Sequence, residues 1–223
     1  MPQTGINLAK QLSAFHASFL QRLPPRDRTM LENAAKNLRA DVGARVIPKA
    51  GELAPDFVLS DQHGRLVRLS ERLAQGPVVL LFIRGGWCPF CTLTLRAYQA
   101  CLPAIHDAGA DLLAITPERA DSCSVMAERD LLAFPTLSDQ KNGVAEAYGI
   151  AYDLDPGVRS LYLRLGHDLP RLNGTGNWRV PLPATFIIGQ DGHVALADLA
   201  PQINFRLEPA MAVKALRALS VPA

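Results

Sequence analysis

Residues 78–91 read Val-Val-Leu-Leu-Phe-Ile-Arg-Gly-Gly-Trp-Cys-Pro-Phe-Cys. The first six of these residues, 78–83, are all aliphatic or aromatic, which is typical of a central strand covered on both faces. Two glycines then allow a sharp turn, and Cys88 and Cys91 follow at the start of a helix predicted over residues 89–107. The segment therefore predicts a buried strand that leads directly into a helix carrying a Cys-x-x-Cys pair.

From residue 54 onward, strand and helix patterns alternate along the chain. The predicted strands cover residues 56–59, 67–69, 78–83, 111–115, 185–188 and 193–197. The predicted helices cover residues 89–107, 116–132, 144–148 and 208–219. Between them lies an irregular stretch, residues 151–180, in which Asp155-Pro156 can start a short helix. This order predicts an α/β fold in which a central mixed sheet carries helices on both faces.

Two more helices are predicted ahead of this domain, within residues 6–40. Apolar residues recur at helical spacing in the first of them, and Pro24-Pro25 ends it. Residues 43–55 contain two prolines and two glycines, which is typical of a linker. We therefore predict an N-terminal helical extension over residues 1–45 and a main domain over residues 46–223. The apolar stripe of the extension must be buried either on the main domain or on a second copy of the chain, which would make a homodimer.

The composition excludes several classes of function. The chain has 223 residues, of which 48% are hydrophobic and 20% are charged, as in a soluble globular protein. Its longest unbroken apolar run, 78–83, is far too short to cross a bilayer, and its start shows no secretory signal. Lys and Arg number 23 against 21 acidic residues, a balance that gives no electrostatic footprint for nucleic acid or an anionic membrane. We expect a cytoplasmic protein with no nucleic-acid or membrane partner.

Cysteine usage points to one kind of chemistry. Four cysteines are too few for a secreted disulfide framework in a chain of this length. In a reducing compartment, the spacing of Cys88 and Cys91 indicates either metal binding or redox chemistry. Structural zinc would need further ligands such as Cys101 and His106, but the second Cys-x-x-Cys pair that such sites normally use is missing. We therefore predict a redox pair that needs neither a metal nor an organic cofactor.

The two cysteines occupy different positions on the predicted helix. Cys88 falls at the helix N-terminus, where free amide N–H groups and the helix dipole favour a thiolate. Arg84 either adds positive charge there or pairs with a carboxylate elsewhere. Cys91 lies on an apolar stripe, so we expect it to be covered and Cys88 to be exposed. An exposed attacking thiol with a sheltered partner can open a substrate disulfide and then release itself from the mixed disulfide.

Three other residues belong to the predicted site or its surroundings. Pro183 stands just before the strand predicted at 185–188, where a cis peptide bond would leave backbone groups free to pair with an extended substrate. The local sequence alone favours an ordinary trans bond there. Trp87 is expected to pack beside the cysteines. Cys123 is a candidate third, resolving thiol, although a buried cysteine more often serves as a small hydrophobic residue.

These residues resemble a known family. The chain has a Trp-Cys-Pro-Phe-Cys motif after a buried strand and a proline before a later Ala-Thr-Phe-Ile-Ile strand. This arrangement resembles that of proteins with the thioredoxin fold. The chain more closely resembles the peroxiredoxin-like branch of the alkyl hydroperoxide reductase and thiol-specific antioxidant superfamily. The motifs that carry this resemblance are Ala54-Pro55-Asp56-Phe57, residues 82–91, Ile115-Thr116-Pro117 and Leu137-Ser138-Asp139. The resemblance runs from near Gly51 to Leu219 and implies a thioredoxin-like fold and a thiol-dependent antioxidant oxidoreductase.

The chain departs from this family at the site itself. Peroxiredoxins carry a Pro-x-x-x-Thr-x-x-Cys motif. In this chain Arg84 stands in place of the proline, and Cys88 stands in place of the threonine. Cys91 therefore falls at the peroxidatic position. The family's assisting arginine precedes the Ala-Thr-Phe strand, where this chain has Pro183, as thioredoxin-like reductases do. Thioredoxins also place a buried acid where this chain has Phe82. The resemblance thus implies a peroxiredoxin body that carries a thioredoxin-type site.

These inferences lead to one functional prediction. The Cys88–Cys91 pair cycles between dithiol and disulfide, with Cys88 attacking disulfides, Cys91 resolving, and Pro183 positioning the substrate. The substrate is either a hydroperoxide, as the superfamily implies, or a protein disulfide, as the site implies. If the substrate is a hydroperoxide, Cys91 is a second candidate for the attacking residue. Electrons would come from a thioredoxin-like or glutathione-like donor. The alternatives are a dedicated protein thiol-disulfide oxidoreductase without peroxidase activity, or a catalytically silent redox-sensing or zinc-binding module.

Overall fold

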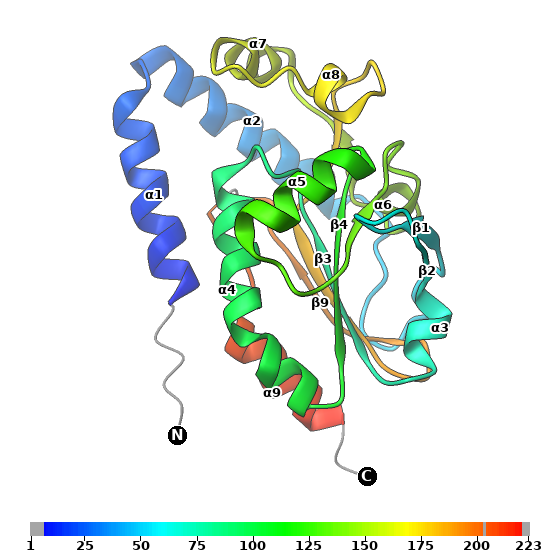
Figure 1. The fold of residues 1–223 in the computed structure, drawn as a ribbon. Helices are drawn as coiled ribbons and strands as arrows, with labels where there is room; N and C mark the ends of the chain where they lie inside the picture. The colour runs from blue at the N-terminus through cyan, green and yellow to red at the C-terminus, as the bar shows by residue number, and fades with distance from the viewer. Residues whose placement is uncertain (1–6, 203, 220–223) are drawn as a thin grey trace.

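The computed structural model describes residues 7–202 and 204–219, and a seven-stranded sheet runs through its centre (Figure 1). The strands, in the order in which they lie in the sheet, are β2 (Leu66–Arg68), β1 (Val58–Ser60), β5 (Thr136–Ser138), β4 (Asp111–Thr116), β3 (Val78–Phe82), β8 (Ala184–Ile188) and β9 (Val194–Leu199). β4 pairs in parallel with β3 and β5, and the other neighbours pair antiparallel. The predicted mixed sheet of an α/β fold is confirmed.

Helices cover both faces of this sheet. The helices that follow the extension are α3 (Leu69–Leu73), α4 (Pro89–Asp107), α5 (Ala120–Asp130), α6 (Gly143–Ala147), α7 (Pro156–Arg164), α8 (Leu169–Asn173) and α9 (Pro209–Leu219). Successive residues of a strand point to opposite faces, so Val79 and Leu81 of β3 join the core with α4 and α9, whereas Leu80 and Phe82 join the core with α3 and α6. The continuous apolar run therefore has the two-sided burial predicted for it. None of the described helices combines the length and hydropathy needed to span a bilayer.

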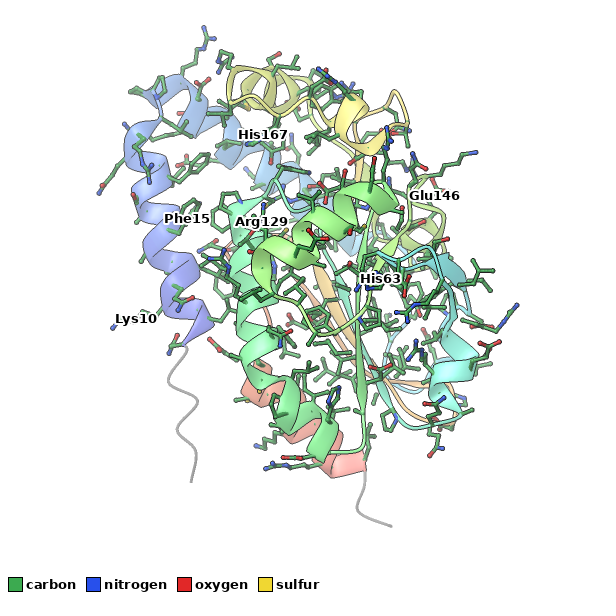
Figure 2. All side chains as sticks on the ribbon, viewed as in Figure 1. Lys10, Phe15, His63, Arg129, Glu146 and His167 are labelled. Carbon is green, nitrogen blue, oxygen red and sulfur yellow. The ribbon has the colours of Figure 1, made fainter. Side chains whose placement is uncertain are left out.

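The N-terminal extension forms two helices, α1 (Leu8–Arg22) and α2 (Pro25–Gly43), as predicted. The stripe of α1 lies on the main domain: Leu8 and Leu12 are fully buried in the core that contains α4. Phe15 points toward the same helix and meets Phe90 edge-on at 5.0 Å between ring centroids (Figure 2). Of the two predicted ways to bury the stripe, the structure shows packing on the chain's own main domain.

Two polar contacts hold the extension, one at the start of α1 and one at the start of α2. The backbone N–H groups of Leu8 and Ala9 donate to the carboxylate of Glu208, at 3.3 and 2.6 Å, so a negative charge sits at the positive end of the α1 dipole. Arg164 at the end of α7 donates to both carboxylate oxygens of Asp27 in α2, at 2.8 Å each. Helix α2 is thereby held across the main domain, next to α7 (Figure 1).

The structure corrects some predicted boundaries. The helix predicted from Thr116 begins only at Ala120, because Thr116 is the last residue of β4 and pairs with Ser138 of β5. Five short elements were not predicted: helices α3 and α8, strand β5, and the strands β6 (Ala151–Asp153) and β7 (Arg179–Pro181), which form a separate two-stranded sheet. Elements of three to five residues leave too few positions for a hydrophobic period to show.

Candidate active site

The turn from β3 into α4 is tight and depends on glycine. Gly85 has φ of 145°, and a Cβ at this position would lie 2.4 Å from the indole nitrogen of Trp87 and 2.9 Å from the carboxyl carbon of Glu118. The next N–H, of Gly86, donates to a carboxylate oxygen of Glu118 at 2.7 Å. The turn closes with a bond from the Cys88 N–H to the Gly85 carbonyl at 3.2 Å. Only glycine allows this close approach, which fixes where Cys88 points.

Cys88 is the N-cap residue of α4, as the sequence predicts. Its carbonyl accepts hydrogen bonds from the N–H groups of Cys91 and Thr92, at 2.9 and 3.1 Å. The prediction that Cys88 is exposed is wrong: its side chain is 2% exposed, and that of Cys91 is fully buried. The burial of Cys88 comes from residues far away in sequence, in the N-terminal helices and α7. The two thiols still differ, because Cys88 lines a cavity and Cys91 does not.

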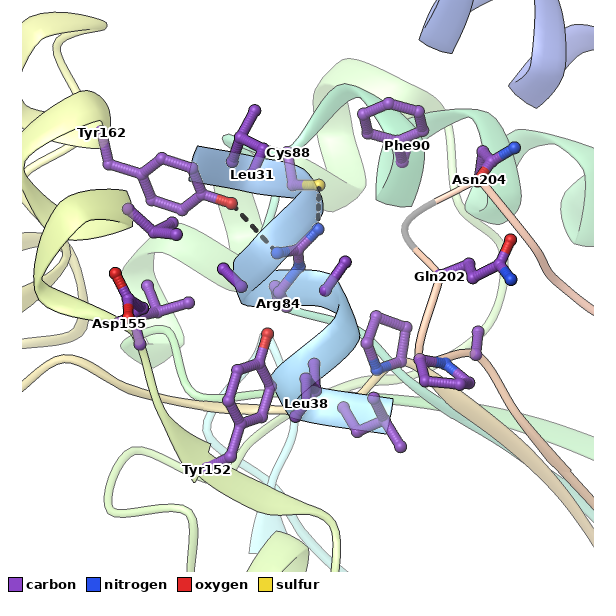
Figure 3. Close-up of a pocket in the computed structure, with 18 of the residues that line it drawn as sticks. Leu31, Leu38, Arg84, Cys88, Phe90, Tyr152, Asp155, Tyr162, Gln202 and Asn204 are labelled. Carbon is purple, nitrogen blue, oxygen red and sulfur yellow. Dashed lines mark hydrogen bonds between the residues drawn. The ribbon is translucent and has the colours of Figure 1, made fainter. Parts of the chain in front are cut away.

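Arg84 places its positive charge beside Cys88 (Figure 3). Its guanidinium is 5% exposed, and one terminal nitrogen lies 3.9 Å from the Cys88 sulfur while the other donates to the Tyr162 hydroxyl at 3.0 Å. In the described part of the chain, the hydrogen-bond partners of this guanidinium are the phenols of Tyr162 and Tyr152 and the Cys88 thiol, and none is a carboxylate. A buried cation is stable only beside a compensating anion. The Cys88 sulfur lies in the position of that anion.

The two thiols have opposite acidities. A hydrogen bond with the Cys91 thiol lowers the pKa of Cys88 to about 5; burial opposes this shift, and the charges of Arg84 and Arg206 reinforce it. The same hydrogen bond, together with burial and the negative charge of Cys88, raises the pKa of Cys91 well above its ordinary range. At neutral pH the pair is therefore a thiolate at Cys88 with its one shared proton on Cys91. A thiolate at the cavity and a protonated partner behind it are suited to attack followed by resolution.

Arg206 is a site residue that the sequence reasoning missed. It lies in the segment between β9 and α9, its side chain is 9% exposed, and its charge acts on both Cys88 and Cys91. A hydrogen bond links its side chain to Cys91. The segment has no helical or strand period and no motif, so nothing local in the sequence marks this arginine. The structure thus brings a second guanidinium to the thiol pair from the far end of the chain.

Aromatic side chains form one wall of the site. The ring of Trp87 lies 5.3 Å from that of Tyr162 and 5.2 Å from that of His167, measured between centroids. All three line the cavity with Cys88, as does Tyr152, which lies near Arg84 in Figure 3. Burial raises the pKa of Tyr162 to about 12, so its phenol keeps its proton at neutral pH. Trp87 is therefore where the sequence predicts it, and the two tyrosines are additional residues at this site.

Pro183 also lines the cavity, directly before β8. The cis bond suggested for it is absent: none of the described peptide bonds is cis. Its carbonyl accepts a hydrogen bond from Ala200 at 2.9 Å, and the preceding Leu182 donates its N–H to Ile150 at 2.7 Å. These backbone groups are bonded within the protein, so they are not free to pair with an extended substrate.

The remaining cysteines lie apart from this chemistry. Cys123 is fully buried on α5, its sulfur is 4.0 Å from the Glu118 carbonyl oxygen, and burial raises its pKa to about 12. Burial also raises the pKa of Cys101 on α4. Neither residue lines the cavity that Cys88 faces. Within residues 7–202 and 204–219, no group of three or more His, Cys, Asp or Glu residues is arranged to hold a metal ion.

Comparison with known proteins agrees with this geometry. A family model described as the AhpC/TSA family matches residues 50–197. The chain is 34% identical over 102 residues to Peroxiredoxin Bcp of Escherichia coli strain K12, a match that covers 46% of this chain and 65% of that protein. It is 30% identical over 145 residues to the thiol-disulfide oxidoreductase ResA of Geobacillus thermodenitrificans strain NG80-2, covering 65% of this chain and 66% of that protein.

Solved structures give the same result. The crystal structure of Peroxidoxin BcpB from Mycobacterium tuberculosis aligns with a TM-score of 0.61 and 26% identity, over 78% of this chain and 97% of that one. A mutant of Peroxiredoxin 6 of Arenicola marina aligns with a TM-score of 0.62 over 77% of this chain and 73% of that one; at 18% identity, it supports the fold alone. The family match extends over residues 50–197 of the 223, and the resemblance inferred from the sequence is confirmed. The chain belongs to the AhpC/TSA family and has its thioredoxin-like, peroxiredoxin-like fold.

Proposed function

We propose that this protein is a thiol-dependent oxidoreductase that reduces a hydroperoxide or a disulfide through Cys88 and Cys91. One observation carries the proposal: the Cys88 sulfur lines a cavity, at the N-terminus of α4, 3.9 Å from a buried guanidinium that has no carboxylate among its described hydrogen-bond partners. Thiolates are stabilised by helix N-termini and nearby cations, and the thiolate is the nucleophilic form. The peroxiredoxin and ResA relatives are consistent with this chemistry.

With a hydroperoxide ROOH, the thiolate of Cys88 attacks one peroxide oxygen and the O–O bond breaks. The alkoxide RO⁻ leaves and takes a proton from solvent to become ROH, and Cys88 becomes a sulfenic acid, having lost two electrons to the peroxide. The Cys91 thiol then attacks the sulfur of this sulfenic acid, an S–S bond forms, and water leaves. Arg84 and Arg206 lie where their charges can stabilise the anion that develops on oxygen.

With a disulfide RSSR, the thiolate of Cys88 forms a mixed disulfide and releases one RS⁻ group. Cys91 then attacks the Cys88 sulfur, the second RSH leaves, and the same intramolecular disulfide results. In both cases Cys88 is the attacking residue. Cys91, the other candidate for peroxide, has a fully buried thiol that keeps its proton and does not reach the cavity.

A thioredoxin-like or glutathione-like thiol donor would return the disulfide to the dithiol state. We place this cycle in the cytoplasm, where such donors keep protein thiols reduced. Neither a metal nor an organic cofactor takes part in these steps. Trp87 and Pro183 form the wall against which the substrate lies, and Cys123, with its raised pKa, is not required.

The test compares three proteins: wild type, Cys88→Ser and Cys91→Ser. Consumption of hydrogen peroxide and cumene hydroperoxide is measured with dithiothreitol as reductant, whereas the neutral disulfide 4,4′-dithiodipyridine is mixed with the pre-reduced protein after dithiothreitol has been removed, because dithiothreitol reduces this disulfide directly. Wild type should reduce at least one oxidant, and Cys88→Ser should lose that activity. Cys91→Ser, treated with the oxidant in the absence of dithiothreitol, should accumulate a Cys88 sulfenic acid or mixed disulfide visible by mass spectrometry. Rates no faster than that of a free thiol with every oxidant would favour the silent binding module instead.

A dedicated protein thiol-disulfide oxidoreductase remains the second candidate, supported by the Cys-x-x-Cys pair and the ResA relative. The same three proteins decide between the two candidates when reduction of insulin is measured beside peroxide consumption. Insulin reduction that depends on Cys88, without peroxide consumption, would establish the second candidate.

A further inference from the structure

We infer that the helices α1 and α2 select the substrate of this site. They close it into a chamber for a small organic oxidant with an apolar body, and they exclude protein disulfides. The inference rests on the proposed role of Cys88 as the attacking thiol. Residues 8–43, which form these helices, precede the part of the chain that the family model matches, so the selection belongs to this chain's own extension.

The chamber has the size of a small-molecule site. Its volume is about 660 Å³, and residues of α1, α2, α7 and the segment that follows β9 line it together with Cys88. Sites for small organic ligands are typically about 300–1,000 Å³. Phe15 and Phe19 of α1 and Leu31 and Leu38 of α2 lie on the side that the extension supplies. The two helices therefore supply part of the wall that faces Cys88.

Polar and apolar side chains both lie close to the thiol. Arg84 contacts Cys88 and Tyr162 and lies between Cys88 and Tyr152, while Leu31 and Leu38 of α2 stand beside this group (Figure 3). An oxidant that is reduced at Cys88 would therefore have its O–O or S–S bond among donors and its body against apolar side chains. Burial of that body supplies binding free energy that a bare peroxide lacks.

The histidines in the wall add no positive charge to the chamber at neutral pH. Burial lowers the pKa of His16 and of His167, so both are neutral at pH 7. Acidic and basic side chains also line the chamber: they are Glu32, Arg39, Asp41, Arg45, Asp153 and Asp155. They carry both signs, and Arg45 and Asp41 pair with each other. The chamber therefore presents no single-sign field that would favour a highly charged ligand.

A protein disulfide is excluded on two grounds. The Cys88 side chain is only 2% exposed, so a folded or extended chain cannot bring its sulfur to it without moving the helices. Substrate chains that bind by strand addition also need free backbone groups. At the expected position those of Leu182 and Pro183 bond to Ile150 and Ala200, at 2.7 and 2.9 Å. Both observations point to a small molecule.

The wild-type protein gives the first test. We expect kcat/KM for cumene hydroperoxide or 4,4′-dithiodipyridine to exceed that for hydrogen peroxide by at least about tenfold, the discrimination that a small apolar contact provides. Whichever of the two is preferred identifies the reactive bond as O–O or S–S. Insulin should be reduced no faster than by dithiothreitol alone. Insulin turnover matching that of the small apolar oxidant would overturn the inference.

The second test is Leu31→Ala, with Leu163→Ala as the matched control. Leu31 lines the chamber, whereas Leu163 is 52% exposed on α7 and does not line it. Leu31→Ala should lower kcat/KM for the preferred apolar oxidant about tenfold and leave the value for hydrogen peroxide within about twofold. The hydrogen peroxide rate also reports that the variant is folded. The control should change neither rate.

The outcomes separate this inference from the proposed function. If Cys88→Ser keeps full activity with every oxidant, or wild type reduces none of them, the proposed function fails. If activity requires Cys88 but shows no preference for apolar oxidants, or Leu31→Ala lowers all rates equally, only the selection by α1 and α2 fails.

Discussion

The negative charge of Cys88 depends on three neighbours, two from its own strand–turn–helix unit and one from the far end of the chain. Cys91 shares its proton with Cys88, Arg84 stands at the end of β3, and Arg206 comes from the segment before α9. Each removes part of the cost of holding an anion in a buried place. The thiol that we propose as the attacking group is thus ionised before any substrate arrives, and each contribution can be removed separately.

Replacement of Arg84 by Met should raise the pKa of Cys88 from about 5. Loss of an adjacent cation raises the pKa of an acid by about one to three pH units, so the thiolate should form only near pH 6–8. The ultraviolet absorbance of the thiolate, followed against pH, measures this directly, and Cys88→Ser supplies the baseline. The sign follows from the charge: without the cation the ionised form is less stable, so the absorbance step moves to higher pH.

Arg206→Met should move the same step upward by less, because Arg84 has the larger effect on Cys88. Arg119→Met is the matched control, since Arg119 forms an exposed pair with Asp121 at 2.7 Å, away from the thiols. An unchanged thiolate step in Arg84→Met would show that the guanidinium is not the counter-ion of Cys88.

Four of the residues that the sequence predicts for the site belong to one strand–turn–helix unit, while Pro183, which also lines the cavity, and Cys123, which does not, lie outside it. Arg84, Trp87, Cys88 and Cys91 lie within eight positions of one another, so a local pattern places them together. Arg206 and the two tyrosines reach the site only through the fold, from segments that carry no motif. The exposure of Cys88 was predicted wrongly for the same reason, since the cover over it comes from elements distant in sequence.

The turn between β3 and α4 is the element that sets the position of Cys88. Gly85→Ala should destabilise the protein by about 2–4 kcal/mol, because the new methyl group meets the Trp87 indole and Glu118 in a backbone conformation that L side chains rarely adopt. Denaturant unfolding measures the loss. Gly43→Ala is the control: a Cβ there meets nothing within 4 Å, and alanine favours the helix, so stability should stay within about 1 kcal/mol. Equal effects of the two substitutions would refute a special role for the turn.

Glu118, which lies before α5, links this turn to the neighbouring strand–helix connection. The free energy cost of burying its carboxyl group depends on pH. Burial raises its pKa from near 4.5 to about 7, against the opposing bond from the Gly86 N–H. The folded state therefore holds the proton at pH values where the unfolded state has lost it. Its contribution to stability is complete below about pH 4.5 and is lost as pH rises through 7.

Glu118→Gln removes this titration but keeps an acceptor for Gly86. Relative to wild type, the variant should gain about 3 kcal/mol of unfolding free energy between pH 4.5 and pH 7, the equivalent of the pKa change. Urea unfolding of both proteins across this range measures the difference, in which the titration of Cys88 cancels because both proteins contain it. Parallel stability curves would contradict the raised pKa of Glu118.

At the scale of elements, length decides what the sequence can predict. The long α4 and the continuous strand β3 carry enough positions for their periods to be unambiguous, and both were predicted to within a residue. The three-residue strands β6 and β7 pair only with each other, in the stretch predicted as irregular. Their pairing depends on tertiary contacts and leaves no period in the sequence.

In the whole molecule, the extension and the family domain form one continuous core. The split into a helical extension over residues 1–45 and a thioredoxin-like domain over residues 46–223 stays a prediction, as does a homodimer. Leu8 and Leu12 nevertheless belong to the same buried cluster as residues of α4 and α9. The extension is therefore expected to unfold together with the domain that it covers.

Leu12→Ala tests this at the scale of the molecule. Leu12 is fully buried, so its truncation should cost about 2–5 kcal/mol of unfolding free energy and leave a single cooperative transition. Leu163→Ala, at a residue 52% exposed, should cost less than about 1 kcal/mol. Because the stripe of α1 is buried within one chain, the loss should not depend on protein concentration, measured over a hundredfold range. A loss that grows on dilution would mean that a second copy of the chain covers α1, since only an association equilibrium makes stability depend on concentration.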